Sequence, residues 1–244
     1  MRMTQSIPKR LAAIGAAAVL TMSFAHPVNA QIADSSFVLI RPSTLDMGSK
    51  EFAPKHLVVI SRGYMIQKTE VTQAQWIAVM KNNPSVHSEC GLTCPVENVS
   101  WNDVQTFIAE LNLRSPGKTY RLPTEAEWEL AAASGVAGGV GPKPFQYWIA
   151  ESSGGVPHPV AQLHPTSLGV YDMLGNVWEW VSDWYAPYGT LSDRDPKGPA
   201  TGDQKVFRGG AFDYTAQFAA YAYRRSTDPA DHVGDIGFRL VRAQ

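Results

Sequence analysis

Cys90 and Cys94 have the most reactive side chains in this sequence, because a thiol can form a disulfide, bind a metal or act in redox chemistry. They lie four positions apart. In an oxidising compartment an isolated pair is typical of a disulfide, here one that closes a very small loop and adds at most about 2 kcal/mol of stability. The alternative is a CxxxC redox or metal-binding pair. His87 is the only nearby imidazole, and two thiolates with one imidazole are one ligand short of a structural zinc site. We therefore predict a Cys90–Cys94 disulfide.

The remaining candidate metal ligands show no ligand spacing, and the charge excludes two classes of partner. No HxH or HxxxH pattern joins the histidines that follow residue 30, which are His56, His87, His158, His164 and His232. Residues 31–244 carry 18 Lys and Arg against 22 Asp and Glu, a net charge of −4. No basic run or basic amphipathic helix is present, so we expect no nucleic acid and no anionic membrane surface among the partners.

Three capping boxes mark where helices begin. Each has a hydroxyl residue followed three positions later by Gln, Asp or Glu, and the two side chains can satisfy each other's main-chain N–H groups. They are Thr72–Gln75, Ser100–Asp103 and Thr124–Glu127. Behind the second box one apolar helix face predicts a helix that ends near Leu113. The first helix is expected to stop at 82–84 and the third at 134–135.

Short apolar runs predict strands before and after these helices. The candidates are 37–40, 57–60, 64–66, 176–181, 205–208, 221–225 and 237–241, with loops at 42–48 and 136–169. Helices early, short strands late and many loops between them indicate an α+β domain that is rich in loops, with two or three helices and short antiparallel strands. No linker divides residues 31–244, so one domain is expected there.

Residues 1–30 have the three-part layout of a signal peptide. Arg2, Lys9 and Arg10 precede an apolar run from Leu11 to Phe24, and Val28-Asn29-Ala30 offers small residues at the −3 and −1 positions. The run is short of the ~20 residues that span a bilayer, which disfavours the alternative of an uncleaved anchor. We predict cleavage after Ala30, a periplasmic or secreted protein, and no stable membrane insertion.

Four motifs in this order resemble the formylglycine-generating-enzyme, or sulfatase-modifying-factor, family. They are Pro95–Trp101 (PVENVSW), Tyr120–Glu129 (YRLPTEAEWE), Gly169–Trp180 (GVYDMLGNVWEW), and Phe207–Gly210 with Ile236–Arg239 (FRGG and IGFR). The resemblance runs from about residue 37 to the C-terminus and implies a variant of the C-type lectin fold. From the residues themselves, we expect the arginines of these motifs to tie loops through bidentate pairs with acids such as Glu125, Glu127 or Glu179.

The resemblance implies a structural calcium ion. The positions that match the family's ligands are Asp172 and Glu179 through their carboxylates, and Gly175 and Val177 through their carbonyls. Such hard oxygen donors suit calcium. The alternative is a metal-free turn in which Gly175 and Asn176 supply left-handed residues.

The same resemblance implies that the family's oxidase chemistry is missing. Formylglycine formation in the family uses two cysteine thiolates on one copper ion and a nearby serine. Counting from Arg208-Gly-Gly, the serine position is Ala211 and the thiol positions are Tyr214 and Ala219. Soft thiolates select Cu(I), and no cysteine follows Cys94, so we expect no copper.

Two functions remain open on these grounds. The first is an exported accessory or maturation protein that binds a polypeptide or peptide-like partner, with Tyr214, Phe218, Tyr221, Tyr223 and Trp148 as candidates for its surface. The second is a periplasmic oxidoreductase acting on a peptide or a siderophore-like metabolite, as exported members of the family do. No cofactor motif supports the second hypothesis, and catalytic residues are not identifiable.

Overall fold

The computed structural model describes residues 32–134, 146–189 and 193–243. The predicted signal peptide and part of the predicted 136–169 loop lie outside these ranges. Within them the elements run in the order β1 (Phe37–Ile40), β2 (Ser43–Ser49), β3 (Ala53–Ile60), β4 (Tyr64–Gln67), α1 (Gln73–Met80), α2 (Trp101–Leu113), β5 (Tyr120–Arg121), α3 (Glu125–Ala133), β6 (Trp178–Trp184), β7 (Lys205–Arg208), β8 (Arg224–Thr227), β9 (Ile236–Phe238) and β10 (Val241–Ala243), with short 3₁₀ turns at Asp34–Ser36 and Ser88–Cys90.

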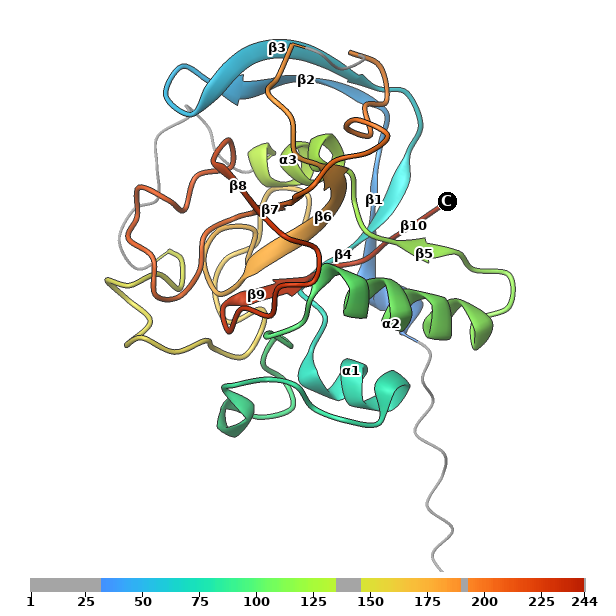
Figure 1. The fold of residues 1–244 in the computed structure, drawn as a ribbon, viewed down its shortest axis with the longest axis vertical. Helices are drawn as coiled ribbons and strands as arrows, with labels where there is room; N and C mark the ends of the chain where they lie inside the picture. The colour runs from blue at the N-terminus through green and yellow to red at the C-terminus, as the bar shows by residue number, and fades with distance from the viewer. Residues whose placement is uncertain (1–31, 135–145, 190–192, 244) are drawn as a thin grey trace, which may run out of the picture.

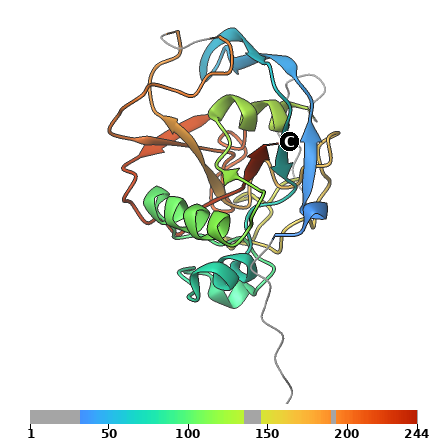
Figure 2. The same ribbon diagram turned by 90° about the vertical axis from the view of Figure 1, so that its right-hand side faces the viewer.

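The strands form three sheets around one interior. Their orders are β1-β4-β10-β5, β2-β3 and β8-β7-β6-β9. Most pairings are antiparallel as predicted, but β6 and β9 pair in parallel, with Glu179 opposite Gly237. Strand β10, drawn in dark red, lies between β4 and β5 (Figure 2).

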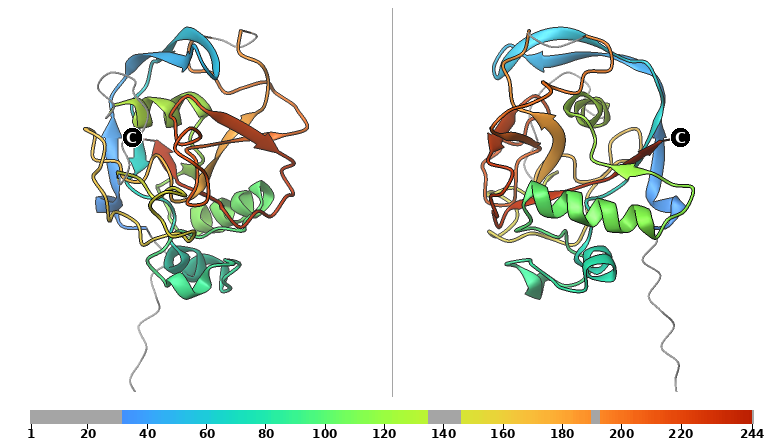
Figure 3. Two further views of the ribbon diagram at one scale, coloured as in Figure 1. Left: turned by 90° about the vertical axis from the view of Figure 1, so that its left-hand side faces the viewer. Right: turned by 45° about the vertical axis from the view of Figure 1, so that its right-hand side comes forward.

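The three helices begin where the capping boxes predict. In each box the hydroxyl accepts from the N3 main-chain N–H, and the N3 side chain accepts from the cap's own N–H. α3 lies under the arched β2–β3 ribbon, and α1 and α2 cover the opposite end of the molecule (Figures 1 and 3). The expected α+β class is confirmed.

The prediction of a loop at 42–48 is wrong, because this segment is strand β2 paired with β3. Several other strands differ from their predicted bounds. β3 begins at Ala53 rather than at 57, β6 spans Trp178–Trp184 rather than 176–181, and β8 spans Arg224–Thr227 rather than 221–225. The predicted 237–241 strand is divided by residues 239–240 into β9 and β10.

The tryptophans of the motifs form the core, as their size predicts. Trp128, Trp178 and Trp180 are completely buried, whereas Trp101 is half-buried. Trp76 of α1 stacks on Phe107 of α2, with ring centroids 5.2 Å apart, and this packing fixes the two helices against each other.

Candidate functional site

Buried arginines hold the motifs together, as predicted. The Arg239 guanidinium is fully buried and donates to both carboxylate oxygens of Glu179, at 2.7 Å and 2.6 Å, and to the carbonyls of Gln67 and Tyr171. The indole N–H of Trp128 also donates to Glu179, at 2.7 Å. Both Glu179 oxygens therefore accept hydrogen bonds from within the protein.

A second buried cluster ties β7 to α3. The Arg208 guanidinium pairs with Glu125 and Glu129, and it also donates to the Tyr221 carbonyl. Arg224 donates two 2.7 Å hydrogen bonds to Glu125. Burial raises the pKa of Glu129, while Arg208 opposes the shift. On the surface side, Arg121 makes the predicted bidentate pair with Glu127.

The turn that carries the predicted calcium ligands is tightly built. Asp172 and Asn176 have φ near +54° and +60°. A Cβ atom on Gly175 would lie 2.4 Å from the Trp148 carbonyl oxygen, so only glycine fits there. The carboxylate of Asp172 accepts from the main-chain N–H of Ala161 at 2.7 Å. Burial raises the pKa of Asp172, and the charges of Arg239 and Glu179 nearby act on it in opposite directions.

Glu70 belongs to this cluster, although sequence reasoning did not select it. Its carboxylate is completely buried, with one oxygen accepting from the Asn176 amide at 3.0 Å and the other accepting from no described residue. Burial, followed by the charge of Asp172, raises the pKa of Glu70 well above its ordinary value. A lone glutamate before a helix cap gives no sequence signal of this role.

The cluster supplies hard oxygen donors of the kind that calcium binds, but the described carboxylates alone do not form a metal site. Three carboxylates, those of Glu70, Asp172 and Glu179, share one guanidinium, that of Arg239, so negative charge is in excess when all three are ionised. Hard oxygen donors in excess of positive charge are what calcium requires. In the described residues no three His, Cys, Asp or Glu side chains are placed to hold one metal, so a calcium ion here needs main-chain carbonyls as well.

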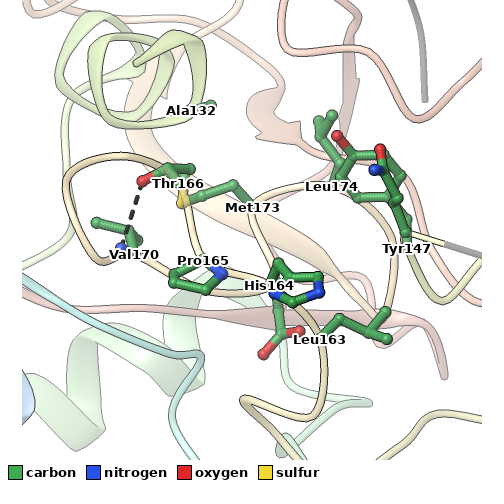
Figure 4. Close-up of a pocket in the computed structure, with 11 residues that line it drawn as sticks. Ala132, Tyr147, Leu163, His164, Pro165, Thr166, Val170, Met173 and Leu174 are labelled. Carbon is green, nitrogen blue, oxygen red and sulfur yellow. Dashed lines mark hydrogen bonds between the residues drawn. The ribbon is translucent and has the colours of Figure 1, made fainter. Parts of the chain in front are cut away.

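A small pocket of about 60 Å³ leads to Asp172. Figure 4 shows His164, Pro165 and Met173 around it, with Tyr147 and Leu163 on one side. The volume is enough for a few water molecules or one hydrated ion. Asp172 thus lies in the wall of this pocket.

The positions that match the family's copper site carry no sulfur. Ala211 and Ala219 are completely buried, and a Cβ on Gly210 would come within 3.0 Å of the Ala219 Cα. Tyr214 is half-buried, and its phenol oxygen accepts from Arg225 at 2.8 Å. The two cysteines of the chain, Cys90 and Cys94, form the predicted disulfide.

An aromatic cluster adjoins these positions. We call Phe52, Tyr214, Phe218 and Tyr223 the aromatic face. All four are half-buried, and neighbouring rings in it have centroid distances between 5.1 Å and 5.6 Å. Beside it lies a pocket of about 160 Å³ that is lined mainly by small side chains between Ala216 and Ala222, with Ser49, Glu51 and Phe52 opposite.

Two predicted surface residues lie elsewhere. Trp148 stacks on the His158 ring at 3.7 Å. Tyr221 is not part of the aromatic face itself; it lines the pocket beside that face and is partly buried against the core around α3. The described residues contain no helix that is both long and apolar enough to cross a membrane.

Residues 24–244 match the family of the sulfatase-modifying factor enzyme 1-like domain, and the chain belongs to this family. It is 38% identical over 170 residues to a formylglycine-generating enzyme of Streptomyces coelicolor, covering 60% of this chain and 52% of that protein. The match thus spans about half the length of that relative.

Two other proteins match over most of their length. A chaperone protein named LppX from Paenibacillus barcinonensis is 26% identical over 271 residues, covering 88% of this chain and 92% of that protein. The solved structure of Treponema denticola variable protein 1 is 29% identical with a TM-score of 0.76, covering 85% of this chain and 95% of that one.

Proposed function

We propose that this protein is an exported accessory or maturation protein that binds a polypeptide or peptide-like partner and does not generate formylglycine. One observation carries the proposal: Ala211, Tyr214 and Ala219 replace the family's reactive side chains, next to the aromatic face and an open alanine-lined pocket. Half-buried aromatic rings supply large contact area at small entropic cost, which suits recognition. The near-full-length likeness to a protein named a chaperone supports the same proposal.

The test is binding of the purified mature protein to a degenerate peptide library on a solid support. Wild type should retain peptides, and Phe218→Ala should retain several-fold less, because a central aromatic contact of an interface is commonly worth more than 1 kcal/mol. Leu113→Ala is the matched control, since Leu113 is exposed at the end of α2. Equal peptide retention by wild type and by a folded Phe218→Ala variant would contradict the proposal that the aromatic face binds the partner.

The oxidoreductase alternative is tested on the same sample. Stoichiometric copper or iron in the purified protein, or oxygen consumption with a retained peptide, favours an enzyme over a binding protein. A metal-free protein that binds peptide without consuming oxygen favours the accessory role.

The calcium ion remains part of the proposal. Asp172 and Glu179 would supply carboxylate oxygens and Gly175 and Val177 would supply carbonyls, as the resemblance implies. The buried Glu70 would be a further carboxylate donor. The role of the ion would be to neutralise the excess of buried negative charge and to fix the turn at 172–177.

A further inference from the structure

The pocket beside the aromatic face is lined by three segments that lie far apart in the sequence. Ser49, Glu51 and Phe52 come from the end of β2 and the turn that follows it, Leu174 comes from the turn at 172–177, and the remaining residues lie between 216 and 222. The volume of the pocket is about 160 Å³. The Phe52 ring also meets the Tyr223 ring at 5.1 Å, so the pocket adjoins the aromatic face.

The lining of this pocket is mainly apolar. Four alanines leave the space open because each contributes only a methyl group, and a leucine and two aromatic rings complete the apolar surface. The alanines are Ala216, Ala219, Ala220 and Ala222. Ala219 and Ala222 are buried, whereas Ala216 and Ala220 are half-buried, so the pocket reaches from the surface to the core. The lining contains no histidine, cysteine, lysine or arginine, and it therefore suits an apolar group rather than a metal ion or an anion.

Hydrogen bonds hold both walls of the pocket in place. On one side, the Ser49 hydroxyl accepts from the main-chain N–H groups of Glu51 and Phe52, at 3.2 Å and 3.0 Å. On the other side, the carbonyl of Tyr221 accepts from the buried guanidinium of Arg208. A pocket whose walls are fixed beforehand loses little conformational freedom when a ligand group enters it.

Glu51 places one negative charge at the rim of the pocket. It is exposed, and it is the only acidic or basic residue in the lining. No salt bridge joins its carboxylate to a residue within the described ranges. A basic residue beside the bound group would be attracted to this charge, and an acidic residue would be repelled by it.

We propose that this pocket binds one apolar side chain of the polypeptide partner, between leucine and phenylalanine in size, from a segment that carries a basic residue beside it. This inference rests on the proposed function and names the side chain that is recognised. An apolar cavity of about 150 Å³ can hold a benzene molecule, so the pocket has room for a leucine or phenylalanine side chain. The indole ring of tryptophan is larger than this space. Removal of the apolar side chain from water would supply the free energy of binding.

The experiment compares degenerate peptide libraries that differ in one fixed central residue: Ala, Leu, Phe or Trp. Wild type should bind the Leu and Phe libraries about tenfold more tightly than the Ala library, because only the larger side chains fill the pocket. The Trp library should bind more weakly than either. Two further libraries place Lys or Asp next to a central Leu, and the Lys library should bind several-fold more tightly than the Asp library.

Two variants of the lining test the pocket directly. Ala220→Leu adds an isopropyl group at a half-buried position of the wall, which should fill the pocket and abolish the preference for Leu and Phe over Ala. Glu51→Gln keeps the shape of the side chain and should abolish only the preference for Lys over Asp. Ala230→Leu is the matched control, since it adds the same group at an exposed position on the loop before β9 and should keep both preferences.

The outcomes separate the two proposals. Equal binding of the Ala, Leu and Phe libraries by wild type would overturn the pocket inference and leave the peptide-binding function standing. Failure of every library to bind would overturn both. A preference for Leu and Phe that persists in a folded Ala220→Leu variant would also overturn the inference, as would tightest binding of the Trp library or equal binding of the Lys and Asp libraries. If Ala220→Leu does not fold, the wild-type comparison decides.

Discussion

Arg208 and Arg239 are completely buried, and each is neutralised by glutamates that lie 60 to 83 positions away in sequence. Removing one member of such a pair leaves an uncompensated buried charge, which costs far more than the pair itself contributes. Both arginines therefore fix how distant motifs meet.

Arg239→Met should lower the free energy of unfolding by about 3–5 kcal/mol, because Glu179 would stay buried without its guanidinium. Chemical denaturation at pH 7 measures this change. Asp46→Asn is the control, since Asp46 forms an exposed pair with Lys55 and such pairs contribute about 1 kcal/mol or less. A loss of stability no larger than that of the control would contradict the role given to Arg239.

The buried carboxylate of Asp183 should make the free energy of unfolding depend on pH. Its carboxylate is buried and accepts from the Glu125 main-chain N–H and the Ser182 hydroxyl, both at 2.9 Å. Burial, followed by the charge of Glu125, raises its pKa to about 7 in the folded protein. The unfolded value is about 3.9, so the folded state binds the proton more tightly, and the Asp183 contribution to stability falls as pH rises from about 4 to about 7.

Asp183→Asn should therefore flatten the decline in unfolding free energy over this window. Denaturation curves of wild type and variant at several pH values between 4 and 8 give the difference. Parallel curves over the whole range would show that Asp183 titrates normally in the folded protein.

At the scale of elements, the helices could be predicted and one hairpin could not. A capping box is a local pattern, so Thr72, Ser100 and Thr124 identify their helices without knowledge of the fold. β2 has no such signal, because it is held by β3 and by α3, where the Gly48 N–H donates to Glu129 at 2.7 Å. That contact joins residues 81 positions apart, so no local sequence pattern could predict it.

The residues of the candidate site differ in the same way: some of their roles could be predicted from the sequence and others could not. The acid partners of Arg121, Arg208 and Arg239 could be predicted in kind, since a guanidinium group pairs in a bidentate manner with a carboxylate. Glu70 could not, because its importance lies in being buried without a full set of partners. That property depends on which distant segments cover it.

Thr124→Ala should destabilise the protein by about 1 kcal/mol through loss of the cap on α3. The hydroxyl of Thr124 accepts from the Glu127 N–H, and Glu127 also pairs with Arg121, so the box joins α3 to β5. Thermal unfolding followed by circular dichroism measures the effect. Thr124→Ser keeps the hydroxyl and should remain close to wild type; equal losses in both variants would point to the methyl group instead.

The turn at 172–177 should respond to calcium. Calcium at 100 times its dissociation constant should add about 2.7 kcal/mol to the stability of wild type relative to a sample with EGTA. Asp172→Asn should lose this increment, whereas Asp203→Asn, which removes the same charge from an exposed loop before β7, should keep it. Identical thermal unfolding of wild type with calcium and with EGTA would contradict the proposed calcium site.

For the whole molecule, residues 24–244 match the family, and the motif arginines and tryptophans are buried in its interior. The resemblance puts the family's serine and thiol positions at Ala211, Tyr214 and Ala219. The two alanines are buried in the core, and Tyr214 belongs to the aromatic face. One scaffold can host different functions when its site changes in this way.

The most direct test of this account is an assay for formylglycine. The purified mature protein is loaded with Cu(I) and mixed with oxygen and a cysteine-containing sulfatase peptide, and the aldehyde product is measured by mass. A thiolate pair is needed to hold Cu(I), and the only two cysteines of the chain are joined in a disulfide remote in sequence from residues 211–219. We predict no aldehyde above a copper-only control. Turnover above that control, lost when a residue between Ala211 and Ala219 is substituted, would contradict the account.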